Sequence, residues 1–182
     1  SDASGKALFP NATVWVPQGE ADYWLDPAKE ASAPANAKEY FAIARHALAA
    51  YKATGHLKTF VPPASPIPEI QTAYAVGHTP GSTVYRFASE GKAINFIGDL
   101  IHAPAVQFPH PEVSIRFDVD AKKATASRGQ EFNALAKDGE WMAAAHLAFP
   151  GIGHITTDAQ GYSWNPAIYG PYQRVADVPL LK

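Results

Sequence analysis

Three polar residues, His78, Asp99 and His146, each come just after a run of apolar residues that is typical of a β-strand. A sheet delivers the residues at its strand ends to a shared rim, where a rigid backbone can hold several side chains close together. Imidazole and carboxylate groups are suitable ligands for zinc and similar divalent ions. A lone histidine after a strand is more often a loop residue, and Gly-Asp is a common turn pair. The pattern therefore leaves two interpretations open, a metal site or unrelated loop residues.

The composition narrows the chemistry further. The 182 residues are 47% apolar and 18% charged, which is enough apolar material for a buried core. The net charge is −2 and the basic residues are scattered, which argues against nucleic acid as a partner. No apolar run approaches the ~18 residues that span a bilayer, so no membrane partner is expected. The absence of cysteine excludes disulfides and thiolate ligands, and leaves seven histidines as the soft donors.

The elements expected to position these side chains follow an α/β order. Strands are predicted over residues 12–16, 57–61, 70–76, 83–87, 93–97 and 141–145, and helices over residues 20–25, 37–53 and 120–137. Asn36 and Asp120 are expected to cap the two longer helices. Residues 28–35, 103–118 and 147–182 are predicted as loops, the last with one strand.

Several segments together resemble one known family. Residues 77–83 (GHTPGST) and 96–102 (FIGDLIH) resemble the HTPGHT and GD motifs of metallo-β-lactamase-fold hydrolases, with room for one hairpin between them. Residues 145–154 (AHLAFPGIGH) are similar to the segment that holds the last histidine ligand of that family. Residues 106–108, 116–120 and 161–166, with 9–12 and 20–25, resemble its methyl parathion hydrolase-like branch. The resemblance covers nearly the whole chain.

This resemblance implies an αββα sandwich, in which two mixed sheets pack face to face with helices outside. It implies that His78 is a ligand of a first metal ion, that Asp99 bridges two ions and that His146 is a ligand of the second. Two divalent ions, with zinc favoured, would lower the pKa of a shared water so that hydroxide attacks a carbonyl or phosphoryl centre. The implied substrate is a small-molecule ester, lactone or phosphotriester.

The chain departs from the family pattern in two places. Ser82 stands where HTPGHT has its second histidine, which is expected to change loop packing rather than metal binding. The HxHxDH motif, which supplies four further ligands in the family, is absent from these 182 residues. We therefore expect residues 1–182 to be the C-terminal part of a single metallo-β-lactamase-like domain. Such a part alone should bind metal weakly or not at all and be inactive, since a catalytic zinc ion normally takes about three protein ligands.

Half of a sandwich would leave one apolar sheet face uncovered. That face is expected to pair with the missing N-terminal segment or with a second copy of the chain. An alternative function follows from the same reasoning, because a fold does not entail its chemistry. The chain could be a non-catalytic remnant used for binding or assembly. No targeting segment is visible, so periplasm and cytoplasm both stay open as compartments.

Other residues could support the site or line its pocket. His102 lies three residues after Asp99 and could orient a metal ligand, although an ordinary loop hydrogen bond explains this histidine equally well. His154 could line the pocket, with a structural role in its loop as the alternative. Trp24, Tyr40 and Phe41 could form an aromatic substrate pocket, although aromatic residues at helical spacing are more often part of a core.

Overall fold

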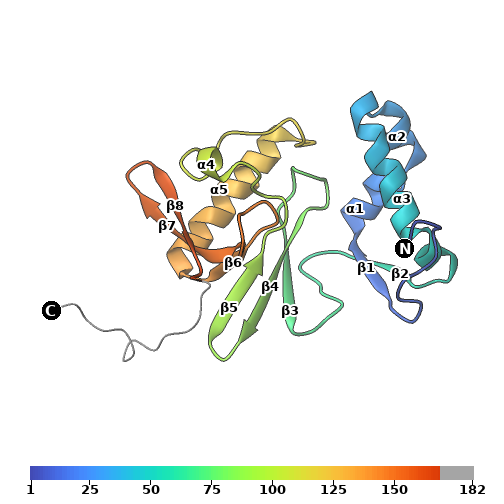
Figure 1. Ribbon diagram of the computed structural model, residues 1–182, viewed down its shortest axis with the longest axis horizontal. Helices are drawn as coiled ribbons and strands as arrows, with labels where there is room; N and C mark the ends of the chain where they lie inside the picture. The colour runs from blue at the N-terminus through green and yellow to red at the C-terminus, as the bar shows by residue number, and fades with distance from the viewer. Residues whose placement is uncertain (169–182) are drawn as a thin grey trace.

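The computed structural model describes residues 1–168, which form two groups of elements (Figure 1). The first group contains β1 (Val14–Pro17), α1 (Gln18–Trp24), α2 (Pro27–Ser32), η1 (Ala35–Ala37), α3 (Lys38–Ala53) and β2 (Leu57–Phe60). The second contains β3 (Ile70–Tyr74), β4 (Thr83–Ser89), β5 (Lys92–Phe96), α4 (Pro104–Gln107), α5 (Ala121–Asp138), β6 (Trp141–Ala143), β7 (Ile152–Asp158) and β8 (Gly161–Pro166). The structure is therefore a mixed α/β fold, as expected.

In the first group, β1 and β2 form a two-stranded parallel sheet, which requires a helical crossover between them. The helix α3 is the longest element of that crossover and buries Phe41 and Tyr51. Its predicted range is confirmed, but Asn36 does not cap it, because the N-cap is Ala37 without a side-chain hydrogen bond. The predicted loop over residues 28–35 instead contains α2, whose N-cap Asp26 accepts a hydrogen bond from the backbone of Ala28.

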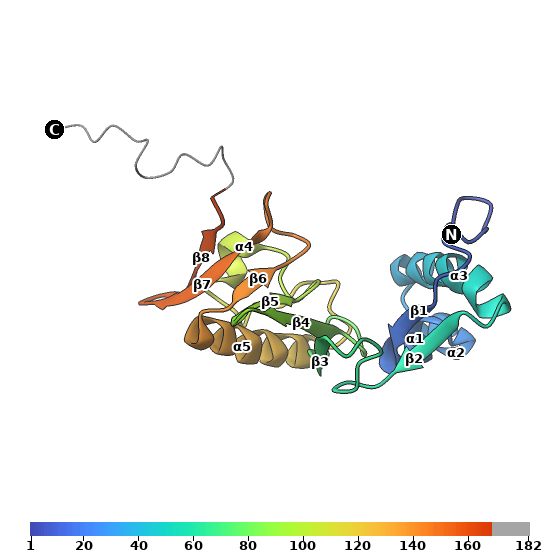
Figure 2. The same cartoon turned by 90° about the horizontal axis from the view of Figure 1, so that it is seen from below.

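The second group is built on a six-stranded sheet with the order β3-β4-β5-β6-β7-β8. All neighbouring strands are antiparallel except β5 and β6, which are parallel and are joined by a crossover through α5. Figure 2 shows α5 running beneath the sheet. The first group of elements lies beyond β3, which is an edge strand of this sheet. The N-cap Asp120 and the left-handed Gly139 bound α5, so both predicted limits are confirmed.

Two predicted loops contain regular structure. Residues 103–118 include the single turn α4, which begins at Pro104 because proline is well suited to the first helical position. Residues 147–168 form the hairpin of β7 and β8 rather than a loop with one strand. The alternation of polar and apolar residues in this hairpin is too weak to stand out among the flanking glycines and prolines. The expectation for residues 169–182 lies outside the described residues.

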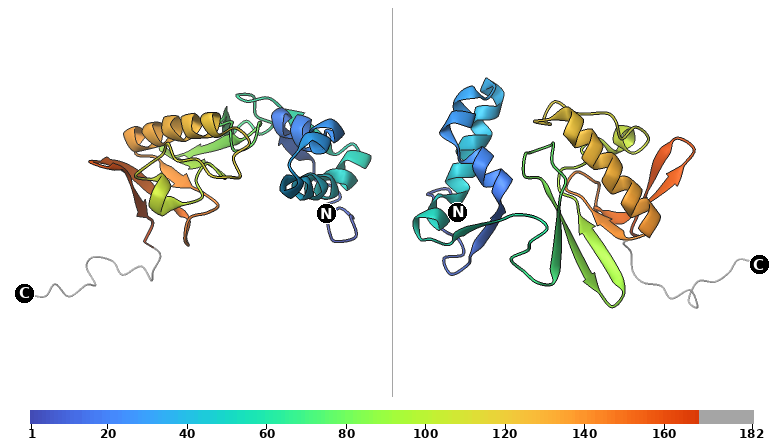
Figure 3. Two further views of the ribbon diagram at one scale, coloured as in Figure 1. Left: turned by 90° about the horizontal axis from the view of Figure 1, so that it is seen from above. Right: turned by 180° about the vertical axis from the view of Figure 1, so that it is seen from behind.

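The core lies between the sheet and α5 (Figure 3). Val84 and Met142 on the sheet pack there with Phe132 and Leu135 of the helix. The opposite face of β3, β4 and β5 exposes large apolar side chains, with Tyr74 43% exposed, Phe87 43% and Phe96 46%. The strand registers place these three on one face. The sheet thus buries one apolar face and leaves apolar residues on the other exposed, as expected for part of a sandwich.

Among the described residues, no helix is both long enough and apolar enough to cross a bilayer.

Candidate metal centre

His78, Asp99 and His146 meet at one rim of the six-stranded sheet, as the sequence predicted. The strand β3 is antiparallel to β4, which is antiparallel to β5, so β3 and β5 run in the same direction. The strand β6 is parallel to β5. The carboxyl ends of these three strands therefore lie at one edge, and each of the three residues follows one of them.

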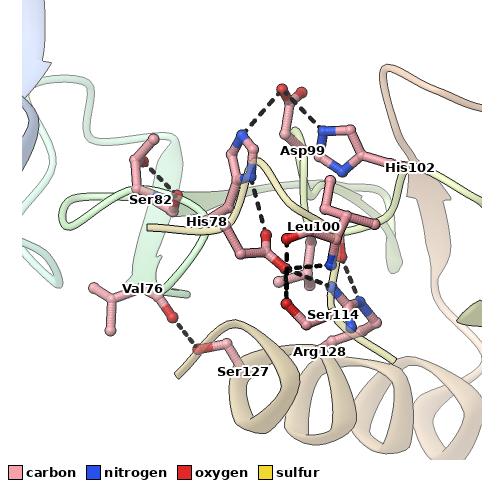
Figure 4. Close-up of polar contacts among 12 residues, drawn as sticks. Val76, His78, Ser82, Asp99, Leu100, His102, Ser114, Ser127 and Arg128 are labelled. Carbon is pink, nitrogen blue, oxygen red and sulfur yellow. Dashed lines mark hydrogen bonds and ion pairs between the residues drawn. The ribbon is translucent and has the colours of Figure 1, made fainter. Parts of the chain in front are cut away.

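Three imidazole nitrogens surround one carboxylate oxygen at this rim. Asp99 Oδ2 lies 3.5 Å from His78 Nε2, 3.4 Å from His146 Nε2 and 3.7 Å from His102 Nε2. The His102 ring lies between the other two, with its centroid 4.7 Å from that of His78 and 4.1 Å from that of His146. Figure 4 shows His78 and His102 converging on Asp99. His102 thus belongs to the cluster itself.

The electrostatics suit a ligand set for a cation. Hydrogen bonding with His78, and then with His146, holds the pKa of Asp99 at about 2 despite partial burial, so its carboxylate is ionised at neutral pH. Burial tends to lower the pKa of His78, but hydrogen bonds with Asp99 and Asp118 outweigh it and raise that pKa. Burial, followed by the charges of its two neighbouring histidines, lowers the pKa of His102.

A tight contact with α5 fixes the loop that carries His78. Gly77 has a φ of 137°, and a Cβ at this position would lie 2.0 Å from the backbone nitrogen of Ala124. The backbone N–H of Asp120 donates to the carbonyl of Gly77, and that of Val119 donates to the carbonyl of His78. The loop therefore rests directly on the start of the helix.

Ser82 completes this loop, at the position where the HTPGHT motif that the segment resembles has its second histidine. Its Oγ accepts a hydrogen bond from the backbone N–H of Thr79 at 3.0 Å and lies 2.6 Å from Thr79 Oγ1. Serine thus closes a local turn through side-chain-to-backbone bonding. Its effect in this structure is on the loop, since it makes no contact with Asp99 among the described interactions.

Asp118 is a site residue that sequence reasoning did not identify. Its side chain is fully buried (0% exposed), and its Oδ1 accepts a hydrogen bond from His78 Nδ1 at 3.1 Å. Burial works to raise the pKa of Asp118, but hydrogen bonds from Ile115, Ser114 and His78 lower it overall. The sequence places Asp118 two residues before Asp120. Because Asp120 accounts for the start of the helix as its cap, the pattern gave no separate reason to assign Asp118 to the site.

A cavity of about 560 Å³ opens beside the histidines. Trp24 and Tyr40 line it together with His78, His102 and His146, so two of the three predicted pocket aromatics face the cluster. The other lining residues are Tyr23, Pro34, Asn36, Ala37, Thr79, Asp99, Arg116, Phe117, Asp118 and Val119.

Phe41 and His154 lie elsewhere. Phe41 is 0% exposed, and its ring packs against those of Tyr23 and Trp24. It therefore supports the aromatic wall of the cavity, which Tyr23, Trp24 and Tyr40 form, without lining the cavity itself. His154 is on β7, where its Nδ1 is 3.2 Å from the carbonyl oxygen of Glu140 and its ring packs on Trp141. It does not line the cavity. Its separation arises because β7 runs antiparallel to β6 and carries His154 away from the rim.

Glu20 fastens the aromatic wall to the rim of the sheet. Its Oε1 accepts hydrogen bonds from Thr79 Oγ1 at 2.5 Å and from the backbone N–H of Gly81 at 2.7 Å. Its Oε2 accepts from the indole N–H of Trp24 at 2.9 Å. One carboxylate on α1 therefore connects an aromatic side chain of the cavity to the loop that carries His78.

The donors present fit a divalent metal ion. His78, Asp99 and His102 each offer one ligand atom, and these atoms lie within 4.8 Å of one another. His102 Nδ1 is buried and has no hydrogen-bond partner. Nitrogen and carboxylate oxygen form a donor set suited to zinc, manganese, iron or cobalt. The arrangement can therefore hold a cation next to a partly aromatic cavity.

Comparisons with known proteins identify solved structures of similar fold. No protein-family model matches the chain, and no curated protein matches it. Among solved structures, AbOPH, a hydrolase in the beta lactamase superfamily, is 38% identical with a TM-score of 0.84, over 92% of this chain and 59% of AbOPH. AidC, a dizinc quorum-quenching lactonase in complex with the product N-hexanoyl-L-homoserine, is 28% identical with a TM-score of 0.82, over 93% of this chain and 60% of AidC.

A probable metal-dependent hydrolase from Staphylococcus aureus matches more distantly. It is 18% identical with a TM-score of 0.67, over 94% of this chain and 58% of its own, and this likeness concerns the fold alone. The chain spans about three fifths of the length of each of these structures. Its fold is that of a partial metallo-β-lactamase sandwich.

Proposed function

We propose that the chain is the C-terminal part of a metal-dependent hydrolase of the methyl parathion hydrolase-like branch. The observation that carries this proposal is the convergence of His78, His102 and His146 on one ionised oxygen of Asp99. The similarity to AbOPH and to the dizinc lactonase AidC supports it. The reaction is hydrolysis of a small-molecule ester, lactone or phosphotriester.

Each polar group at the rim has a distinct part in this proposal. Asp99 would bridge two divalent ions, zinc in the first instance, with His78 on one ion and His146 on the other. Bound there, the ions would supply Lewis acidity and lower the pKa of a water molecule. His102, which burial and its neighbours keep neutral, offers an N–H or a lone pair to a substrate oxygen or an ion.

Further metal ligands would come from residues outside this sequence. Two catalytic ions usually require about three protein ligands each, and the cluster offers three imidazoles and one carboxylate. A second cavity of about 310 Å³ reaches His78 and Asp99 and is also lined by Glu20, Ser82 and Tyr85. We propose that an additional segment lies there and also covers the exposed face that carries Phe87. The chain alone would then bind metal weakly and have little activity.

The aromatic cavity suggests which substrates fit. Tyr23, Trp24, Tyr40 and Phe117 form much of its wall, close to His102. An aryl or acyl group could pack against these rings while the scissile bond lies at the histidine cluster. The walls of such a pocket, rather than the metal ligands, determine the choice among aryl esters, lactones and phosphotriesters.

A non-catalytic role in binding or assembly is the second candidate. The observation that favours it is the exposed apolar face formed by Tyr74, Phe87 and Phe96, which is the kind of surface that contacts another chain. In that case the histidines and Asp99 at the rim would take part in no catalytic reaction.

Metal content and hydrolysis together test the proposal. Bound metal and intact mass are measured for this chain and for a chain that also includes whatever the gene encodes before Ser1. Both are assayed with a 4-nitrophenyl ester, an N-acyl homoserine lactone and an aryl phosphotriester. We expect less than one equivalent of metal on the shorter chain, and two equivalents with chelator-sensitive hydrolysis on the longer one.

The matched variants are His146→Ala and His154→Ala in the longer chain. The first should remove metal and activity, whereas the second should leave bound metal unchanged because His154 lies outside the cluster. Two equivalents on the 182-residue chain would contradict the proposal that outside ligands are needed. A longer chain without metal or turnover, combined with concentration-dependent self-association, would favour the assembly role instead.

A further inference from the structure

We propose that Asp118 is a positioning residue of the metal centre, which sets the tautomer and the orientation of the His78 ring. The inference rests on the proposed function for its relevance to metal binding. Its geometric basis is independent of any bound ion.

The contacts of Asp118 are divided between its two oxygens. Oδ1 faces His78 Nδ1 at 3.1 Å. Oδ2 accepts hydrogen bonds from the Oγ of Ser114 at 2.9 Å and from the backbone N–H of Ile115 at 3.1 Å. Asp118 and Asp99 are both ionised and can only accept hydrogen bonds, so a neutral His78 ring has one hydrogen for two carboxylates. The shorter contact, 3.1 Å to Asp118 against 3.5 Å to Asp99, favours the hydrogen on Nδ1. The Nε2 lone pair is then free on the side of the ring that faces Asp99.

A buried arginine holds this carboxylate in place. The Arg128 side chain is 1% exposed, and its Nη2 lies 3.9 Å from Asp118 Oδ2. Its Nε donates to the carbonyl of Leu100, directly after Asp99, at 2.7 Å, and its Nη1 donates to the carbonyls of Pro111 and Val113. Figure 4 shows Arg128 and Ser114 on the side of His78 away from Asp99. The Arg128 guanidinium thus contacts both the loop that carries Asp118 and the backbone next to Asp99.

These contacts distinguish positioning from a purely structural role. Histidine ligands commonly donate their second ring N–H to a carboxylate, which fixes the tautomer, and loss of that partner typically weakens metal binding about ten- to a hundredfold. A carboxylate that only stabilised its own loop would need the bonds to Ser114 and Ile115 but not the one to His78. The tautomer of His78 therefore reports on positioning alone.

The substitution Asp118→Asn makes a definite prediction. The backbone N–H of Ile115 and the hydroxyl of Ser114 require an acceptor, so the amide oxygen should take the place of Oδ2. The amide NH2 group then faces His78 Nδ1 and must donate to it. The hydrogen on the ring should move to Nε2, and the lone pair that faces Asp99 is lost.

Nitrogen NMR of the metal-free chain labelled with 15N-histidine tests this at about pH 9, where the imidazoles are neutral. The His78 signals are identified by their absence from a His78→Gln sample. We expect the Nδ1–H tautomer in the wild-type chain, the Nε2–H tautomer in Asp118→Asn, and no change in the control Asp120→Asn, which alters the helix cap and its ion pair with Lys123. Circular dichroism checks that each variant is folded.

Titration with Co²⁺, followed by broadening of the histidine signals, gives the second measurement. The concentration for half-maximal broadening at His78 should rise about ten- to a hundredfold in Asp118→Asn and stay within about twofold in Asp120→Asn. An Nε2–H tautomer in the wild-type chain would overturn the proposal even if the variant does not fold, and so would an unchanged tautomer in folded Asp118→Asn. Absence of any Co²⁺ effect on this chain would agree with the need for outside ligands, whereas its absence on the longer chain would count against the proposed function. In either case the tautomer decides the role of Asp118.

Discussion

The contact between Gly77 and α5 allows a quantitative prediction for Gly77→Ala. The new Cβ would lie 2.0 Å from the nitrogen of Ala124 and 2.4 Å from its Cα. Ordinary van der Waals contact begins at 3.4 Å, so the loop and the helix would have to separate by about 1.4 Å. Because both neighbours are backbone atoms, no side-chain rotation can relieve the overlap.

The cost of this substitution has two parts. An alanine at a φ of 137° adds strain of about 1–3 kcal/mol. The required separation would also break the hydrogen bonds from Asp120 to Gly77 and from Val119 to His78, which are 2.9 and 3.1 Å long. Each contributes about 0.5–1.5 kcal/mol to stability. We therefore expect the free energy of unfolding to fall by about 2–6 kcal/mol.

Urea unfolding of the chain measures this loss. Gly91→Ala is the matched control, because Gly91 has a φ of 74° but a Cβ there would meet nothing within 4 Å. It should cost only the left-handed strain of about 1–2 kcal/mol. If Gly77→Ala and Gly91→Ala lowered the stability equally, the close contact between the loop and α5 would be refuted.

Further predictions concern stability and the aromatic wall. Glu140 accepts hydrogen bonds from Arg86 and Asn95, which join β4, β5 and the start of β6, and the bond from Arg86 is the main reason that the pKa of Glu140 is lowered. Because the folded-state pKa is below the unfolded one, this stability is present above about pH 4.5 and is lost as pH falls. Glu140→Gln should therefore cost about 1–2 kcal/mol at pH 7 in urea unfolding and progressively less toward pH 3, and a pH-independent cost would contradict the assignment. Phe41→Ala should lower the free energy of unfolding by about 3–5 kcal/mol, because the ring is fully buried. Tyr40→Ala should change the free energy of unfolding by less than about 0.5 kcal/mol, but it should weaken the quenching of tryptophan fluorescence by 4-nitrophenol. The reverse order of effects would show that Tyr40, and not Phe41, belongs to the core.

Much of the fold could be predicted because its signals are local. The limits of α5 follow from the cap Asp120 and from Gly139, and the strand ends before His78, Asp99 and His146 follow from short apolar runs. The helix α2 and the hairpin of β7 and β8 were missed for a physical reason. The helix α2 contains good helix formers but has only six residues, too few for a helical periodicity to show. The strands β7 and β8 lack a clear alternation of apolar and polar residues beside their glycines.

The same distinction explains what was found and missed in the site. His78, Asp99 and His146 could be identified because each follows a strand in a recognisable motif. Asp118 could not, because its role depends on burial beside His78, which is distant in sequence and becomes a neighbour only when the loop rests on α5. Phe41 and Tyr40 are adjacent in the sequence, yet one is fully buried and the other lines the cavity.

The amino-acid sequence by itself determined the class of donor atoms, the α/β order and the three strand-end positions, because residue type and local pattern depend on the chain alone. Only the tertiary structure decided that β3, β5 and β6 share an edge, that His102 joins the cluster and that His154 does not. These outcomes depend on strand direction and on packing between distant segments, whose energies are sums over many contacts that no short stretch of sequence contains.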